Sequence, residues 1–104
     1  MRQVIDVRQT DAFANWFRSI PEPARKKVTI RITRVQSGLL GDVKSVGGGV
    51  SELWIDHGPG YRVYFTRIGN IVVLLLTGWD KSTQKRDIAA AQDMQARLRK
   101  EESH

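Results

Sequence analysis

The sequence contains no cysteine, and its longest apolar run, Ile71 to Leu76, is short. Without cysteine the chain can form neither disulfides, nor thiolate nucleophiles, nor cysteine-based zinc sites. The apolar run is far too short to cross a bilayer as a helix. The N-terminal segment likewise has no apolar stretch of signal-peptide length. These absences favour a cytoplasmic protein that uses no metal, no cofactor and no membrane partner.

The chain has 104 residues, enough for a single domain over residues 1–104 and too few for a second core. Seventeen Lys and Arg against eleven Asp and Glu give a net charge of +6 and a pI of about 10.2. This charge suits a polyanionic partner such as RNA, DNA or an acidic protein, although a merely basic soluble protein fits it equally well. Five of the cations lie on one predicted helix, and this clustering favours a polyanionic partner over a merely basic protein. They are Arg25, Lys26, Lys27, Arg31 and Arg34.

The N-terminal part predicts a strand over residues 3–8 followed by two amphipathic helices. Thr10 is suited to cap the first helix, because its hydroxyl can accept from an unpaired amide of the first turn. Pro21 ends that helix, and Pro23 suits the first turn of the next. The apolar stripes at helical spacing are Phe13, Trp16, Phe17 and Ile20 in the first helix, and Ala24, Val28, Ile32, Val35 and Leu39 in the second. We expect a helical hairpin lying on a sheet.

The C-terminal part predicts four strands and a final helix. Short β-branched and aromatic runs are separated by Gly, Pro and Asn, which is typical of hairpins. The run Ile71 to Leu76 lacks alternation and is expected to be the central strand, covered on both faces. Ser82 or Thr83 is expected to cap the last helix. The fold class is therefore α+β: a small, mostly antiparallel sheet of about four to five strands, with an N-terminal helical hairpin packed on it and a C-terminal helix.

Strand alternation selects the first candidate site residues. Because neighbouring side chains point to opposite faces, Arg62 and Tyr64 should lie on the face away from the apolar Val63 and Phe65. The adjacent strand should place Trp54 beside them. An arginine next to aromatic rings on an open sheet face can grip a phosphate and stack bases.

A purely structural role for Arg62 is the alternative. Opposite charges facing one another stabilise paired strands, so Arg62 could instead pair with Glu52 or Asp56. Spacing alone slightly favours this structural reading.

Other polar residues surround this strand. His57 is the only histidine outside the C-terminal tail and lies in a Gly- and Pro-rich turn, where its side chain is expected to be exposed. Lys81 stands near the start of the last helix, where free amides and the helix dipole favour an anion. Lys85 and Arg86 add charge there, and Lys44 lies on a short strand. The run Gly47-Gly48-Gly49 lacks the strand-then-helix context of a nucleotide-binding loop and is expected to be a turn.

The strings GDVKSVGGGVSELWIDHGPGYRVYF and VVLLLTGWDKSTQKRDI resemble the RelE/ParE toxin superfamily, and most closely its subgroup of short HigB-like addiction module killer proteins. The resemblance covers essentially the whole chain. It implies the toxin of a type II toxin–antitoxin system, held inactive by its cognate antitoxin in a possible hetero-oligomer. Relatives are mRNA interferases that cut messages at the ribosomal A site without a metal, whereas ParE relatives inhibit DNA gyrase.

The resemblance also assigns roles to residues. The family's strand arginine corresponds to Arg62, its loop lysine to Lys81, and the lysine of its GD-x-K motif to Lys44. Many relatives carry arginine where this chain has Trp54, which could stack on a base instead.

The leading hypothesis is a metal-independent endoribonuclease that leaves 2′,3′-cyclic phosphate ends. Arg62 and Lys81 would stabilise the transition state, and His57 or Tyr61 would act as general acid or base. RNA would be bound by Lys44, Trp54, Tyr64, Lys85 and Arg86. The alternatives are a ParE-like, non-enzymatic gyrase inhibitor and a degenerate toxin that binds only its antitoxin.

Overall fold

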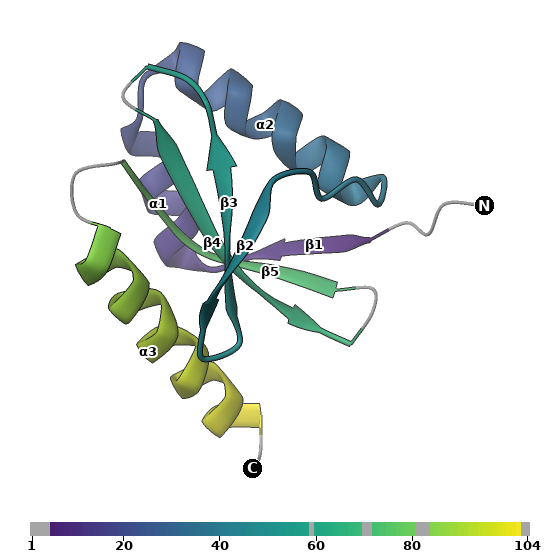
Figure 1. Cartoon of the computed structure of the whole chain (residues 1–104), viewed down its shortest axis with the longest axis vertical. Helices are drawn as coiled ribbons and strands as arrows, with labels where there is room; N and C mark the ends of the chain where they lie inside the picture. The colour runs from purple at the N-terminus through teal and green to yellow at the C-terminus, as the bar shows by residue number, and fades with distance from the viewer. Residues whose placement is uncertain (1–4, 59, 70–71, 81–83, 103–104) are drawn as a thin grey trace.

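The computed structural model of the chain describes residues 5–58, 60–69, 72–80 and 84–102. Within them a five-stranded sheet and three helices follow the order β-α-α-β-β-β-β-α that the sequence predicts. Figure 1 shows α2 above the strands and α3 at the lower left. No helix in these ranges is long and apolar enough to span a membrane. The elements are β1 (Asp6–Gln9), α1 (Asp11–Ser19), α2 (Glu22–Gln36), β2 (Val43–Gly47), β3 (Val50–Ile55), β4 (Tyr61–Ile68), β5 (Val72–Asp80) and α3 (Gln84–Glu102).

The strands are arranged in the order β1-β5-β4-β3-β2, and only the β1–β5 pair is parallel. The apolar run was predicted to form the central strand. Its residues from Val72 on belong to β5, which lies next to the central strand β4, so this prediction is wrong by one strand. Hairpins join β4 to both β3 and β5, while β1 adds on the outer side of β5. The expected cover on both faces of β5 is confirmed: Val73 and Leu75 belong to one core cluster and Leu76 to another.

The α1–α2 hairpin covers one face of the sheet, as predicted. The Oγ1 of Thr10 accepts from the Phe13 amide at 3.1 Å and donates to the Leu76 carbonyl at 2.6 Å, so this cap also ties α1 to β5. The predicted stripe of α2 is one residue too long. Because α2 ends at Gln36 and Gly38 turns the chain with φ +86°, Leu39 lies beyond the helix and is exposed.

The opposite face of the sheet is covered by α3, so the expected open platform is wrong. Tyr64 and Leu76 from the sheet pack with Ala91 of α3 in a second core cluster. The covering of this face was not predicted from the sequence, because α3 carries only a thin apolar stripe. Polar contacts complete the packing: the Nε2 of Gln92 donates to the Val46 carbonyl at 2.9 Å.

The glycine run forms the β2–β3 turn, as expected. Gly48 and Gly49 both have positive φ angles, +63° and +76°, which suit a two-residue hairpin turn. The run also lets α3 approach, since a Cβ on Gly48 would lie 3.1 Å from the Cγ of Gln92. These glycines therefore serve both the turn and the packing of α3.

Candidate functional site

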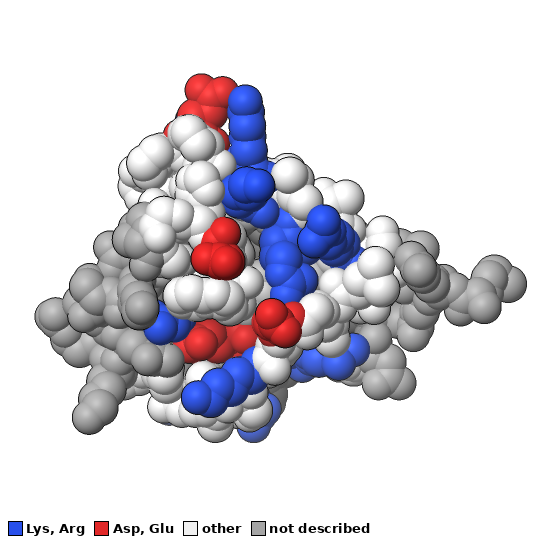
Figure 2. Space-filling model, turned by 45° about the horizontal axis from the view of Figure 1, so that its top comes forward, with Lys and Arg blue, Asp and Glu red and all other residues white. Residues whose placement is uncertain are grey.

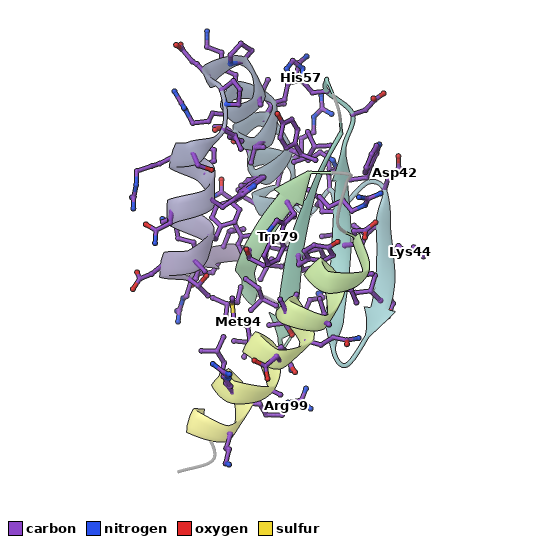
Figure 3. All side chains as sticks on the ribbon, turned by 90° about the vertical axis from the view of Figure 1, so that its left-hand side faces the viewer. Asp42, Lys44, His57, Trp79, Met94 and Arg99 are labelled. Atoms are coloured by element: carbon purple, nitrogen blue, oxygen red, sulfur yellow. The ribbon has the colours of Figure 1, made fainter. Side chains whose placement is uncertain are left out.

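The candidate site begins with a row of three side chains across the middle of the sheet. Arg62 of β4 pairs in register with Trp54 of β3 on one side and with Trp79 of β5 on the other. Directly paired residues point to the same face of a sheet, so an arginine lies between two tryptophans on the face that α3 partly covers. Figure 3 shows Trp79 between the strands and α3.

Arg62 is buried, with only 7% of its surface exposed. Its Nε lies 3.4 Å from Oε1 of Glu52, and its Cζ lies 5.0 Å from the ring centroid of Trp54. The ion pair with Glu52 is the structural alternative that the sequence offered for this arginine. An arginine held by a carboxylate and an aromatic face is fixed in orientation.

The guanidinium of Arg62 keeps unused hydrogen-bonding capacity. Its Nη1 is buried and donates no hydrogen bond in the part of the chain that is described, while its Nε is held only by the ion pair with Glu52 and makes no hydrogen bond there. Buried donors without acceptors are costly, so an anion that satisfied them would bind favourably. Since Arg62 is almost fully covered, an RNA phosphate would reach it only if neighbouring side chains move.

A pocket of about 400 Å³ opens beside this row. Glu52 and Trp54 of β3 contribute to its wall, and the start of edge strand β2 with the two residues before it supplies the rest. Trp54 is half-buried, whereas Asp42 and Lys44 are exposed. The lining residues are Gly41, Asp42, Val43, Lys44, Glu52 and Trp54.

Arg31 of α2 supports the rim of this pocket. Its Nη2 donates to the Asp42 carbonyl at 3.4 Å, and a Cβ on Gly41 would lie within 2.5 Å of the same nitrogen. Burial lowers the pKa of the Arg31 guanidinium; Asp42 opposes this shift, and Arg34 adds to it. The glycine and the arginine therefore hold the chain that presents Asp42.

The two tyrosines among the predicted site residues do not join Arg62 on an open surface. Tyr61 points to the opposite face, where its ring lies 6.2 Å from that of Trp16 in the core under α1 and α2. Tyr64 does share the face of Arg62, but it is fully buried and packs 6.1 Å from Trp79. Neither ring can contact RNA in this conformation, because alternation turns one inward and α3 covers the other.

The remaining predicted residues are placed as follows. His57 is half-exposed in the β3–β4 connection, at the upper end of the hairpin in Figure 3, and its carbonyl accepts from the Gly60 amide at 2.9 Å. Lys81 lies outside the described residues. Lys85 and Arg86 belong to the first turns of α3, and their side chains are also outside the description.

Two residues of the site were not singled out from the sequence. Asp42 shares the pocket with Lys44, and Trp79 flanks Arg62. A signal was present for Asp42, which stands two positions before Lys44. A spacing of two places side chains on the same side of an extended chain.

The predicted cationic face of α2 is also present. Lys26, Lys27 and Arg34 are exposed, and Arg25 and Arg31 are half-buried. Figure 2 shows several Lys and Arg side chains near one another on the face turned toward the viewer, with acidic side chains interspersed among them. In the described ranges, no group of three or more His, Asp or Glu residues could hold a metal ion.

Comparison with known proteins decides the family. Residues 15–99 match the family described as phage derived protein Gp49-like. The chain belongs to the Gp49-like family. A Haemophilus influenzae protein, itself described as uncharacterized, is 44% identical to this Gp49-like chain over 88 residues, covering 84% of the chain and 89% of the relative.

Solved structures show that the Gp49-like chain has the RelE fold. The free E. coli toxin RelE, in a doubly substituted form, superposes with a TM-score of 0.70 at 13% identity, covering 86% of this chain and 95% of that one. A chain of the intact E. coli RelBE toxin–antitoxin complex gives a TM-score of 0.58 at 11% identity, covering 75% and 98%. The predicted fold class is thereby confirmed.

Proposed function

We propose that this Gp49-like chain is the toxin of a toxin–antitoxin pair, of the HigB-like kind, and acts in the cytoplasm as an endoribonuclease on mRNA. The RelE fold supports the first part. The observation that carries the second is Arg62, a sheet arginine with unused donors between two tryptophans. A guanidinium with spare donors and flanking rings suits a phosphate between stacked bases.

The proposed reaction needs only the RNA and side chains of this protein. The 2′-oxygen attacks the adjacent phosphorus while its proton passes to a base, for which His57 is the candidate. The bond from phosphorus to the 5′-oxygen breaks, and that oxygen takes up a proton. The products are a 2′,3′-cyclic phosphate and a 5′-hydroxyl.

Two cations would stabilise the charge that develops on the phosphorus oxygens in this reaction. Arg62 supplies one from β4, and Lys81 supplies the other from the segment after β5. Tyr61 is withdrawn as a candidate acid or base, because its ring faces the opposite core.

The antitoxin partner is proposed from the fold neighbours, one of which was solved in a toxin–antitoxin complex. The positive charge of the chain, +6, favours an acidic segment in such a partner. Messenger RNA and the ribosome are the proposed targets of the free toxin.

A non-enzymatic, ParE-like gyrase inhibitor is the second candidate, and the burial of Arg62 favours it. An inhibitor that acts by binding alone requires no exposed phosphate-binding arginine. The two candidates predict different damage in a cell: cut messages for a nuclease, and broken chromosomal DNA with intact messages for a gyrase inhibitor.

The test is to induce the chain without an antitoxin and to map RNA 5′ ends, with DNA integrity followed in parallel. Arg62→Ala is compared with Arg67→Ala, which removes the same charge from an exposed position on the same strand. We expect new 5′-hydroxyl ends with the unaltered chain and with Arg67→Ala, and their loss with Arg62→Ala.

Because Arg62 is buried, the folding of each variant is checked by circular dichroism, and Arg62→Lys serves as a variant that keeps the charge. A folded Arg62→Ala variant that cleaves RNA as well as Arg67→Ala does would refute the assignment. Chromosome breakage without new RNA ends would replace the nuclease with the gyrase inhibitor.

A further inference from the structure

The pocket beside Trp54 and Glu52, the strand neighbours of Arg62, is an open surface hollow large enough for a small ligand. Its volume of about 400 Å³ lies in the range of small-molecule sites. It combines one aromatic side chain, Trp54, with a cation and two carboxylates. Both Asp42 and Lys44 are exposed, so a ligand can enter without unfolding any element.

Trp54 is held in place as a rigid platform. The guanidinium of Arg62 lies over its ring, with Cζ 5.0 Å from the centroid. The far edge of the indole rests on Gly60, where a Cβ would come within 2.4 Å of the ring. Contacts from two directions therefore fix the indole, while another part of it borders the pocket. A fixed, half-exposed indole beside a pocket is suited to stack a nucleobase.

The polar groups around the platform select among bases. Glu52 is engaged by Arg62 at 3.4 Å, so Asp42 is the carboxylate available to a ligand. Asp42 forms no ion pair within 4.0 Å among the described residues, although its charge acts on Arg31. A carboxylate accepts two parallel hydrogen bonds, and guanine presents two adjacent donors, N1–H and N2–H.

The other three bases fit the same groups less well. Adenine and cytosine each place a ring acceptor beside their amino donor, and uracil places its single N3–H between two carbonyls. A carboxylate repels those acceptors. Lys44, two positions from Asp42, can meanwhile donate to guanine O6, a contact that lysine commonly makes.

We infer that this pocket is a guanine subsite, in which Trp54 stacks the base, Asp42 reads N1–H and N2–H, and Lys44 contacts O6. The inference deepens the proposed nuclease function by naming a base that the RNA substrate would carry next to the cleaved phosphate. Arg31 acts through another residue, because it positions the backbone that presents Asp42.

The test separates binding from cleavage. A labelled 2′-fluoro RNA hexamer with one guanine among uridines has no 2′-hydroxyl to attack, so fluorescence anisotropy reports binding alone. A second hexamer carries inosine, which lacks only the 2-amino group. Inosine therefore loses one hydrogen bond to the charged carboxylate of Asp42. A bond of this kind is strong enough that we expect about tenfold or greater preference for guanine over inosine.

Three variants locate the effect. Asp42→Ala should bind both hexamers equally, and Trp54→Leu should weaken both, roughly tenfold or more. Asp56→Ala is the matched control: Asp56 is exposed just beyond the same strand as Trp54, outside the pocket, and its variant should keep the preference of the unaltered chain.

The inference is overturned if the unaltered chain does not distinguish guanine from inosine, if Asp42→Ala retains the preference, or if Asp56→Ala loses it equally. Cleavage of the matching unmodified RNA is measured separately. A guanine preference that depends on Asp42 without any cleavage would support the subsite and refute the nuclease. Cleavage without a guanine preference would support the nuclease and refute the guanine subsite.

Discussion

Glu52 and Arg62 form an ion pair in which both side chains are only 9% exposed, so removing one charge should cost far more stability than removing both. In Glu52→Gln the side-chain shape is kept, but the buried guanidinium loses the counter-charge of Glu52. At a separation of 3.4 Å and an effective dielectric constant of about 20, the lost attraction is roughly 5 kcal/mol. Breaking one side of a buried pair is typically found to cost about 3–5 kcal/mol.

That loss is a large part of the stability of a small domain, which is about 5–15 kcal/mol. Each kcal/mol shifts the melting temperature of a domain of about 100 residues by roughly 4–8 °C. We therefore expect Glu52→Gln to melt at least about 12 °C below the unaltered chain. Thermal unfolding followed by circular dichroism and urea titration both measure the change.

The double variant Glu52→Met with Arg62→Met tests the cause. Replacing both charges with apolar side chains removes the uncompensated charge, and such replacements are often neutral or stabilising. We expect the double variant to regain most of the stability lost in Glu52→Gln. Asp56→Asn, a carboxylate-to-amide change at an exposed site, should shift the free energy of unfolding by no more than about 0.5 kcal/mol. A loss below about 1 kcal/mol in Glu52→Gln, or a double variant that is less stable than Glu52→Gln, would show that the buried charge of Arg62 is not the source of the cost.

Three further substitutions test the layers around the sheet, each measured as the free energy of unfolding in urea. Thr10→Ala removes the cap of α1 and its bond to β5 and should cost about 1–2 kcal/mol, whereas Thr10→Ser should retain most of the stability. Gly78→Ala would bring a Cβ within 2.5 Å of the Trp16 ring and should cost about 1–3 kcal/mol; a neutral result would show that the ring moves freely. Leu76→Ala empties a fully buried position under α3 and should cost about 2–5 kcal/mol, and a change of a few tenths would contradict the assigned packing of α3.

Much of the fold could be predicted from local patterns. The apolar periods of α1 and α2, the cap at Thr10 and the alternating strands each depend on near neighbours in sequence, and these elements form as expected. The end of α2 was misjudged because Leu39 keeps the helical spacing by chance, although Gly38 had already turned the chain. The middle of the sheet was misjudged because strand order depends on where β1 adds, which no local pattern encodes.

The candidate site depends less on local patterns than the fold does. Alternation correctly placed Arg62 on the face with Trp54 and Tyr64, but it could not show that α3 closes over Tyr64. The thin apolar stripe of α3 hid this contact, since Gln92 and the glycine turn provide part of the packing. Asp42 and Trp79 join the site only through strand pairing: Trp79 pairs with Arg62 across β4 and β5, and Asp42 lies just before β2, which pairs with β3.

Local sequence patterns are sufficient to predict the fold class, the helical hairpin and the face on which Arg62 lies, because periodicity and turn chemistry act over a few residues. Long-range packing is what buries Arg62 against Glu52 and Trp54, turns Tyr61 to the opposite core and leaves a pocket beside β2. Burial and pairing are set by segments distant in the chain, and the same arginine is exposed or enclosed according to what packs over it.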